Sequence, residues 1–69
     1  MKIKYIYGFL QEVEIESDFI PLVGDSVSLM GCLGVPYDIQ AAPMSVTSRT
    51  FSCQSNTVLI SLQKKKLEL

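Results

Sequence analysis

Apolar and polar residues alternate along the first sixteen positions, and this pattern limits the fold more than any other feature of the chain. The odd positions from 3 to 9 are apolar or aromatic, as are Val13 and Ile15, while lysines and glutamates stand at even positions. Such period-two alternation is typical of a strand with one buried and one solvated face. Because a single strand of this length would be unusual, we expect a bend near Gly8 and a hairpin or sharply coiled strand pair.

The two faces of this predicted hairpin have different roles. We expect the aromatic row Tyr5, Tyr7 and Phe9 to lie in the core, since it is embedded among aliphatic residues, rather than to form a base-stacking platform. The glutamates at positions 12, 14 and 16 then share the outer face, where lysines across the sheet can pair with them. A flat row of carboxylates on one strand lacks the convergence that catalysis or cation binding needs.

The remainder of the chain also predicts short strands. Val and Ile together number twelve and Ala only two, which favours strands over helices, and no capped helix or internal repeat is present. Pro21 and Gly24-Asp25 mark a connection before a short strand near 26–29, and extended structure restarts at Tyr37 and Ile39. A strand near 45–53 should contain a bulge, because its apolar residues change parity. A turn at 54–57 then leads to a last strand, 58–62.

These elements predict an all-β fold in one small domain, residues 1–63, followed by a charged tail, residues 64–69. With 69 residues and no helix to cover a sheet face, five or six short strands can bury their apolar sides only by closing on themselves. A five- to six-stranded SH3-like or OB-like barrel or roll is the expected architecture, and a small two-sheet sandwich is the alternative.

The residue inventory excludes several kinds of chemistry. The chain has no histidine, which removes Ser-His-Asp and Cys-His catalysis and every histidine-containing zinc site. No phosphate-binding glycine motif occurs, and the G-x-x-G at Gly31 to Gly34 lacks the basic flanks of an RNA-clamping loop. We therefore expect a protein that is not an enzyme, with no catalytic residue, no metal, no cofactor and no small-molecule substrate.

The two cysteines, Cys32 and Cys53, do not form a C-x-x-C pair. The amino-terminal segment turns acidic at Glu12 and lacks the form of a signal peptide, and the longest uncharged apolar stretch is too short for a membrane helix. We therefore expect two buried, reduced thiols in a soluble cytoplasmic protein, or in a virion if the chain is phage-encoded.

Basic residues concentrate near the two ends of the sequence, although the net charge is −1. If the first and last strands are neighbours, these residues could form one basic side. A small-barrel nucleic-acid-binding protein is the alternative function on this basis, with a salt-sensitive site. That site would consist of Lys2, Lys4, Lys64, Lys65 and Lys66.

The uncharged stretch from Leu29 to Tyr37 is the leading candidate for a contact surface. Its two glycines and its proline predict a loop, and an exposed apolar loop is costly unless it folds back over the barrel or is covered by a partner. Both possibilities remain open from the sequence. Arg49, alone between Lys4 and Lys64, could pair with an acid or anchor a partner. The candidate protein-interface residues are thus Leu29, Met30, Leu33, Val35, Tyr37 and Arg49.

The segment 20–27 (Ile-Pro-Leu-Val-Gly-Asp-Ser-Val), followed by Tyr37, Arg49-Thr50-Phe51 and Val58-Leu59-Ile60, resembles small all-β proteins of phages and bacterial mobile elements. These proteins have an acidic strand, a Pro-x-x-Gly-Asp-x-Val turn, a tyrosine-containing strand and a closing hairpin. The resemblance implies a virion or accessory structural role, or a small regulatory binder, and no catalytic residue. Together with the residue inventory it predicts a non-enzymatic protein-binding or structural assembly module, with a protein partner or homo-oligomerisation.

Overall fold

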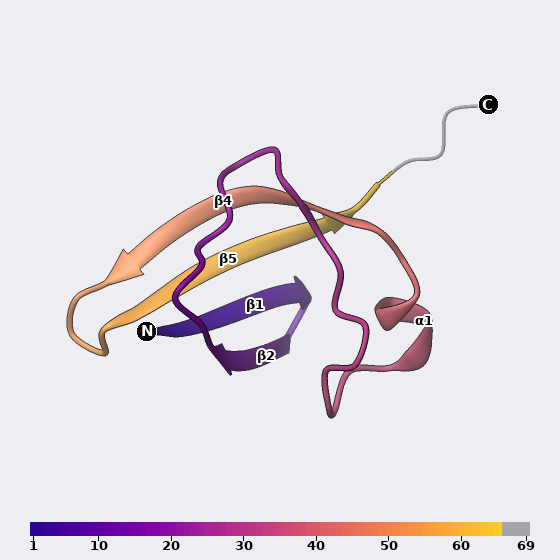
Figure 1. Cartoon of the computed structure of the whole chain (residues 1–69), viewed down its shortest axis with the longest axis horizontal. Helices are drawn as coiled ribbons and strands as arrows, with labels where there is room; N and C mark the ends of the chain where they lie inside the picture. The colour runs from indigo at the N-terminus through magenta and orange to yellow at the C-terminus, as the bar shows by residue number, and fades with distance from the viewer. Residues whose placement is uncertain (66–69) are drawn as a thin grey trace.

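Five strands form a single mixed sheet that curls into a half-barrel in the computed structural model, which describes residues 1–65 (Figure 1). The sheet order is β2-β1-β5-β4-β3, and β1 runs parallel to β5 while all other pairs are antiparallel. The predicted all-β class is confirmed, as one curled sheet. The elements are β1 (Lys2–Gly8), β2 (Gln11–Glu16), β3 (Ser26–Val27), α1 (Tyr37–Gln40), β4 (Met44–Ser52) and β5 (Thr57–Lys64).

The amino-terminal alternation forms the predicted hairpin of β1 and β2. Ile3 lies opposite Ile15 and Tyr5 opposite Val13, so the odd positions share the inner face. The chain turns at Phe9 and Leu10, and Leu10 has a positive φ of 57°. The expectation that Phe9 lies in the core is wrong: its side chain is 91% exposed, because the alternation ends where the turn begins.

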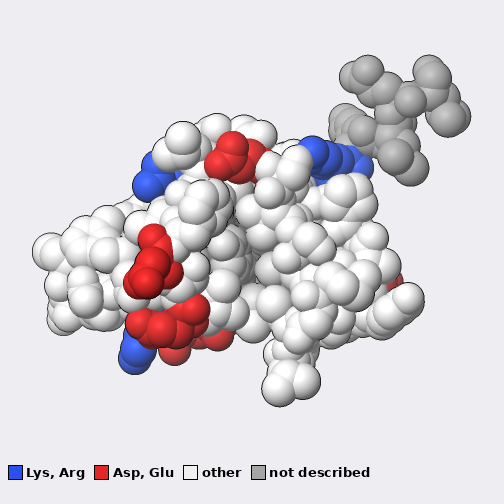
Figure 2. All heavy atoms as spheres, viewed as in Figure 1, with Lys and Arg blue, Asp and Glu red and all other residues white. Residues whose placement is uncertain are grey.

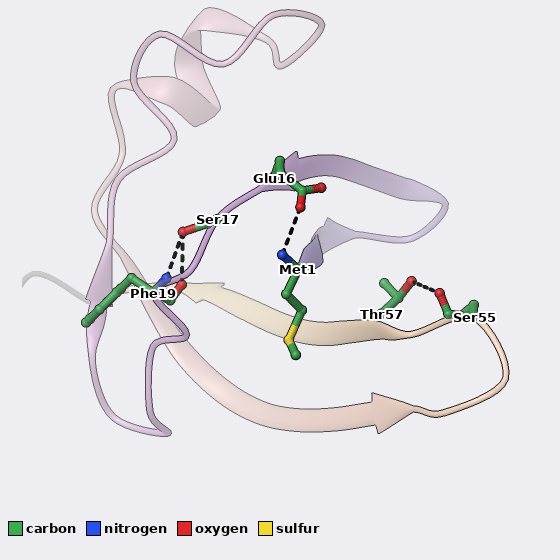
Figure 3. Close-up of polar contacts among 6 residues, drawn as sticks. All are labelled: Met1, Glu16, Ser17, Phe19, Ser55 and Thr57. Atoms are coloured by element: carbon green, nitrogen blue, oxygen red, sulfur yellow. Dashed lines mark hydrogen bonds and ion pairs between the residues drawn. The ribbon is translucent and has the colours of Figure 1, made fainter.

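The predicted bulge is present in β4. The register with β5 shifts between Val46, which pairs with Leu62, and Ser48, which pairs with Ser61. The extra residue changes the parity of the strand, so that Val46 and Phe51 face the same side of the sheet. The turn that follows joins β4 to β5 through Asn56, whose φ is 52°. At its end the buried Thr57 hydroxyl donates to the Ser55 carbonyl (Figure 3).

The core lies between the inner face of the half-barrel and the long connection from β2 to β4. This connection crosses the sheet in Figure 1 and contributes Leu29, Val35 and Ile39 to the buried cluster. The expectation that residues 37 and 39 are extended is wrong, because they belong to the single helical turn α1. Pro36 begins the turn, since its carbonyl accepts bonds from the amides of Ile39 and Gln40. The turn carries Ile39 into the core.

The two cysteines are free, as expected, but only Cys32 is partly buried. Cys53 is exposed in the β4–β5 turn, so the expectation of two buried thiols is wrong for this residue. Figure 1 places that turn and the loop of Cys32 at opposite ends of the molecule. A disulfide needs Cα atoms about 4.4–6.8 Å apart, so the two thiols cannot pair within this fold.

Candidate functional site

The uncharged stretch from residue 29 to residue 37, named here the apolar loop, divides its side chains between the core and the surface. Leu29 and Val35 are buried in the core cluster, and they are therefore not available as surface contacts. Leu33 between them is 93% exposed, and Met30 is also exposed. Tyr37, the first residue of α1, is 76% exposed. Leu29 and Val35 thus fold back into the core, whereas Met30, Leu33 and Tyr37 remain on the surface, where a partner can cover them.

The two buried residues hold the apolar loop at both ends, and its backbone makes two tight turns between them. Cys32 donates its amide proton to the Leu29 carbonyl over 3.0 Å, and Val35 donates to the Cys32 carbonyl over 3.4 Å. Gly31 and Gly34 each have a φ of +85°, in the left-handed region that favours glycine. The pattern that reads as a G-x-x-G motif therefore serves backbone geometry, because it allows Leu33 to stand out between two reversals.

A single side chain, that of Gln40 in α1, fastens the apolar loop from the inside. Its amide oxygen accepts a hydrogen bond from the Gly31 N–H over 3.0 Å. Its amide nitrogen donates to two carbonyls, that of Cys32 over 3.2 Å and that of Val35 over 2.8 Å. We refer to these three bonds as the Gln40 clamp. The sequence alone did not predict it; the only signal was a side-chain amide, which carries two donor protons and an acceptor oxygen, shortly after an apolar stretch.

The surface around the apolar loop carries very little charge. In Figure 2 the acidic side chains gather over β2 and the segment that follows it, whereas the half of this face over α1 and the apolar loop shows charge only at its margins. Asp38 of α1 is exposed next to Tyr37. Charged residues are depleted at the centres of protein interfaces, and aromatic residues and Met are enriched there. The loop combines this surface with exposed apolar side chains held on a fixed backbone.

Arg49 belongs to the half of β4 that leads into the β4–β5 turn, and Figure 1 shows this turn at the end of the molecule opposite α1. Arg49 borders an open cleft of about 380 Å³. No acidic side chain forms an ion pair with Arg49 among the described residues. Apart from Arg49 and Thr50, the residues that line the cleft are apolar. The complete lining is Met1, Ile20, Arg49, Thr50, Phe51 and Val58.

The start of the chain is fixed beside this cleft. The terminal amine of Met1 donates to Glu16 Oε1 over 2.8 Å, and the Met1 side chain extends toward β5 (Figure 3). This hydrogen bond, donated by the amine and accepted by the Glu16 carboxylate, raises the pKa of the amine and lowers the pKa of the Glu16 carboxyl group. Next to it, Ser17 closes a small turn by accepting a bond from the Phe19 amide and donating to its carbonyl.

Among residues 1–65, the lysines of the alternative nucleic-acid site do not gather at one place. The first and last strands are neighbours, but their parallel pairing places Lys2 beside Thr57 at the start of β5. Lys64 is at the other end of β5, roughly 23 Å along the strand at 3.3 Å per residue. Lys4 Nζ lies 3.6 Å from Glu12 Oε1, so this lysine makes the ion pair across the hairpin that the sequence predicted. Lys65 contacts the Ser26 hydroxyl, and Lys66 lies outside the described residues.

Within residues 1–65, no group of three or more histidine, cysteine or acidic side chains is arranged to hold a metal ion. The same residues contain no helix that is long and apolar enough to cross a membrane. Comparison with protein-family models, with curated proteins and with solved structures finds no match to this chain. The candidate site is therefore defined by its own geometry, as a clamped apolar loop.

Proposed function

We propose that this protein is a non-enzymatic protein-binding module, and that the apolar loop is its contact surface. The observation that carries the proposal is the full exposure of Leu33 on a loop whose backbone is held by two core residues and three side-chain bonds. An ordered loop loses little conformational freedom when it binds, so its apolar contacts contribute to affinity without a large ordering cost. Met30 and Tyr37 flank Leu33 with residue types that are common at interface centres.

A structural assembly role is the form of this function that the resemblance to phage and mobile-element proteins implies. In that setting the partner would be another component of the assembly. An experiment can capture the partner whatever its identity: a photo-crosslinking amino acid is placed at Leu33 and the protein is expressed in its natural host. A matched probe at Gln63, which is exposed on β5, reports background contacts.

We expect one dominant crosslinked protein from position 33 and not from position 63. The variant Leu33→Asp should keep the wild-type unfolding midpoint, because the side chain is already in water, and should fail to compete for that partner. Identical crosslinking patterns at the two positions would refute the proposal. A Leu33→Asp variant that unfolds would refute the placement of this side chain outside the core.

A further inference from the structure

The outer edge of β4 is covered along only half of its length. β3 pairs with Met44 and Ser45, and the segment before β3 adds two bonds at Val46, from Gly24 N–H to the Val46 carbonyl over 2.9 Å and from the Val46 N–H to the Asp25 carbonyl over 3.0 Å. Beyond Val46, no strand and no backbone hydrogen bond covers this side of β4 within the described part of the chain. Residues 48–52 therefore form an open strand edge, next to the cleft at Arg49.

The register of β4 with β5 shows which backbone groups point outward from this edge. The Thr47 hydroxyl donates to the Ser61 carbonyl, so Ser61 directs its backbone toward β4. Because backbone direction alternates along a strand, Ile60 and Val58 direct theirs toward β1. Their partners in β4 are Arg49 and Phe51, which consequently direct their N–H and C=O groups to the open edge. This edge offers two donors and two acceptors to another strand.

The two edges of the sheet differ in charge. β2, at the other edge, exposes three glutamates, and like charges of this kind oppose the approach of an identical strand. The open part of β4 has no acid and one base, Arg49, and Phe51 beside it is 54% exposed. An unprotected edge with an exposed aromatic side chain is a template for strand addition.

We propose that a second copy of this chain pairs with the open edge of β4, antiparallel, about a two-fold axis at Thr50. This register places Arg49 directly opposite Phe51 of the partner subunit, and the symmetry repeats the pair. Each such pair exchanges two backbone hydrogen bonds, and each guanidinium lies next to an aromatic ring, which is the arrangement of a cation–π contact. The sheets of the two copies become continuous.

The neighbouring antiparallel registers do not pair Arg49 of one copy with Phe51 of the other. A two-fold axis at Arg49 would place the two guanidinium groups opposite each other, and like charges in that position are destabilising. An axis at Phe51 would place Arg49 against the turn at Cys53, where β4 has ended. The chain is thus self-complementary at one register, which favours a second copy over an unrelated extended peptide.

Thr50 allows a direct test by charge exchange. At the proposed axis the two Thr50 side chains form a non-hydrogen-bonded pair, the position at which opposite side chains come closest. The variants Thr50→Asp and Thr50→Lys each place like charges there, and an equimolar mixture places opposite charges there. Ser28→Asp, at an exposed position away from this edge, is the matched control. Sedimentation or light scattering gives the mass, and differently tagged copies report the mixed dimer.

We expect the wild type and Ser28→Asp to be dimers, with twice the chain mass of 7.7 kDa, at protein concentrations up to about 1 mM. Each Thr50 variant alone should dissociate at least tenfold more readily, and mixing the two should restore a dimer containing one copy of each. A wild type that is monomeric throughout overturns the proposal, whether or not the edge then accepts an unrelated peptide. A dimer that persists in both Thr50 variants, or that Leu33→Asp dissociates instead, also overturns it and leaves the apolar-loop proposal standing.

Discussion

The Gln40 clamp provides a quantitative test of what orders the apolar loop. The variant Gln40→Met has a similar size and shape and removes all three side-chain hydrogen bonds at once. A typical hydrogen bond contributes about 0.5–1.5 kcal/mol net to the free energy of unfolding. Because two of the three bonds are partly buried, we expect Gln40→Met to lower the free energy of unfolding by about 2 kcal/mol. For a domain of this size that corresponds to a fall of roughly 8–16 °C in the unfolding midpoint.

The measurement is thermal and urea unfolding followed by far-ultraviolet circular dichroism. Gln63→Met is the matched control, because Gln63 is exposed on β5 and the change should cost less than about 0.5 kcal/mol. Gln40→Glu refines the test. A carboxylate can still accept the bond from Gly31 but cannot donate, and it faces the carbonyl oxygens of Cys32 and Val35.

Those carbonyl dipoles should raise the pKa of the carboxyl group introduced by Gln40→Glu in the folded state above its unfolded value. Its protonated form is then favoured by folding, so the stability deficit of this variant should be largest at neutral pH and should shrink as the pH falls through the raised pKa. Equal unfolding midpoints for Gln40→Met and Gln63→Met would refute the reasoning. They would mean that Leu29 and Val35 alone hold the loop.

Three further predictions follow from burial and charge. Leu29→Ala should lower the free energy of unfolding by about 2–5 kcal/mol, and Leu33→Ala by less than about 0.5 kcal/mol, in urea titrations; similar losses would contradict the assigned placement of the two side chains. Cys53 should react with a thiol reagent faster than Cys32, so Cys53→Ser should leave only the slow phase of labelling. Glu16→Gln should flatten the pH dependence of stability at both limits. The stabilising pair with the Met1 amine is lost as the pH falls through the lowered pKa of Glu16 or rises through the raised pKa of the amine.

The strands could be predicted from the sequence, because the alternation of apolar and polar residues shows directly which side chains of a strand are buried. The alternation in β1 and β2 predicted the hairpin, and the parity change in β4 predicted the bulge. The same rule failed at Phe9, since parity carries no information past the residue at which a strand turns. α1 was not predicted because one helical turn is not stable by its own propensity, and it exists through the burial of Ile39 and the contacts of Gln40.

The candidate site was accessible only in part. Lack of charge and the two glycines identified the apolar loop, but which of its residues face the core depends on two reversals at positive φ. Periodicity does not describe such a segment, so Leu29 and Val35 could not be separated from Met30 and Leu33. The direction of the β1–β5 pairing was equally hidden, and that direction separates the lysines.

The parallel pairing of β1 and β5 also has a consequence for the order of folding. The hairpin of β1 and β2 is local and can form as soon as those residues are available. The other neighbour of β1 in the sheet is β5, which is the last of the five strands in chain order. Contacts such as that of Ile3 with Val58 require closure of nearly the whole described chain, and contacts of such long range slow folding. Until β5 arrives, Ile3 and Tyr5 have no neighbours on that side. The protein should therefore form its core late in folding and in one cooperative step, when β5 pairs with β1.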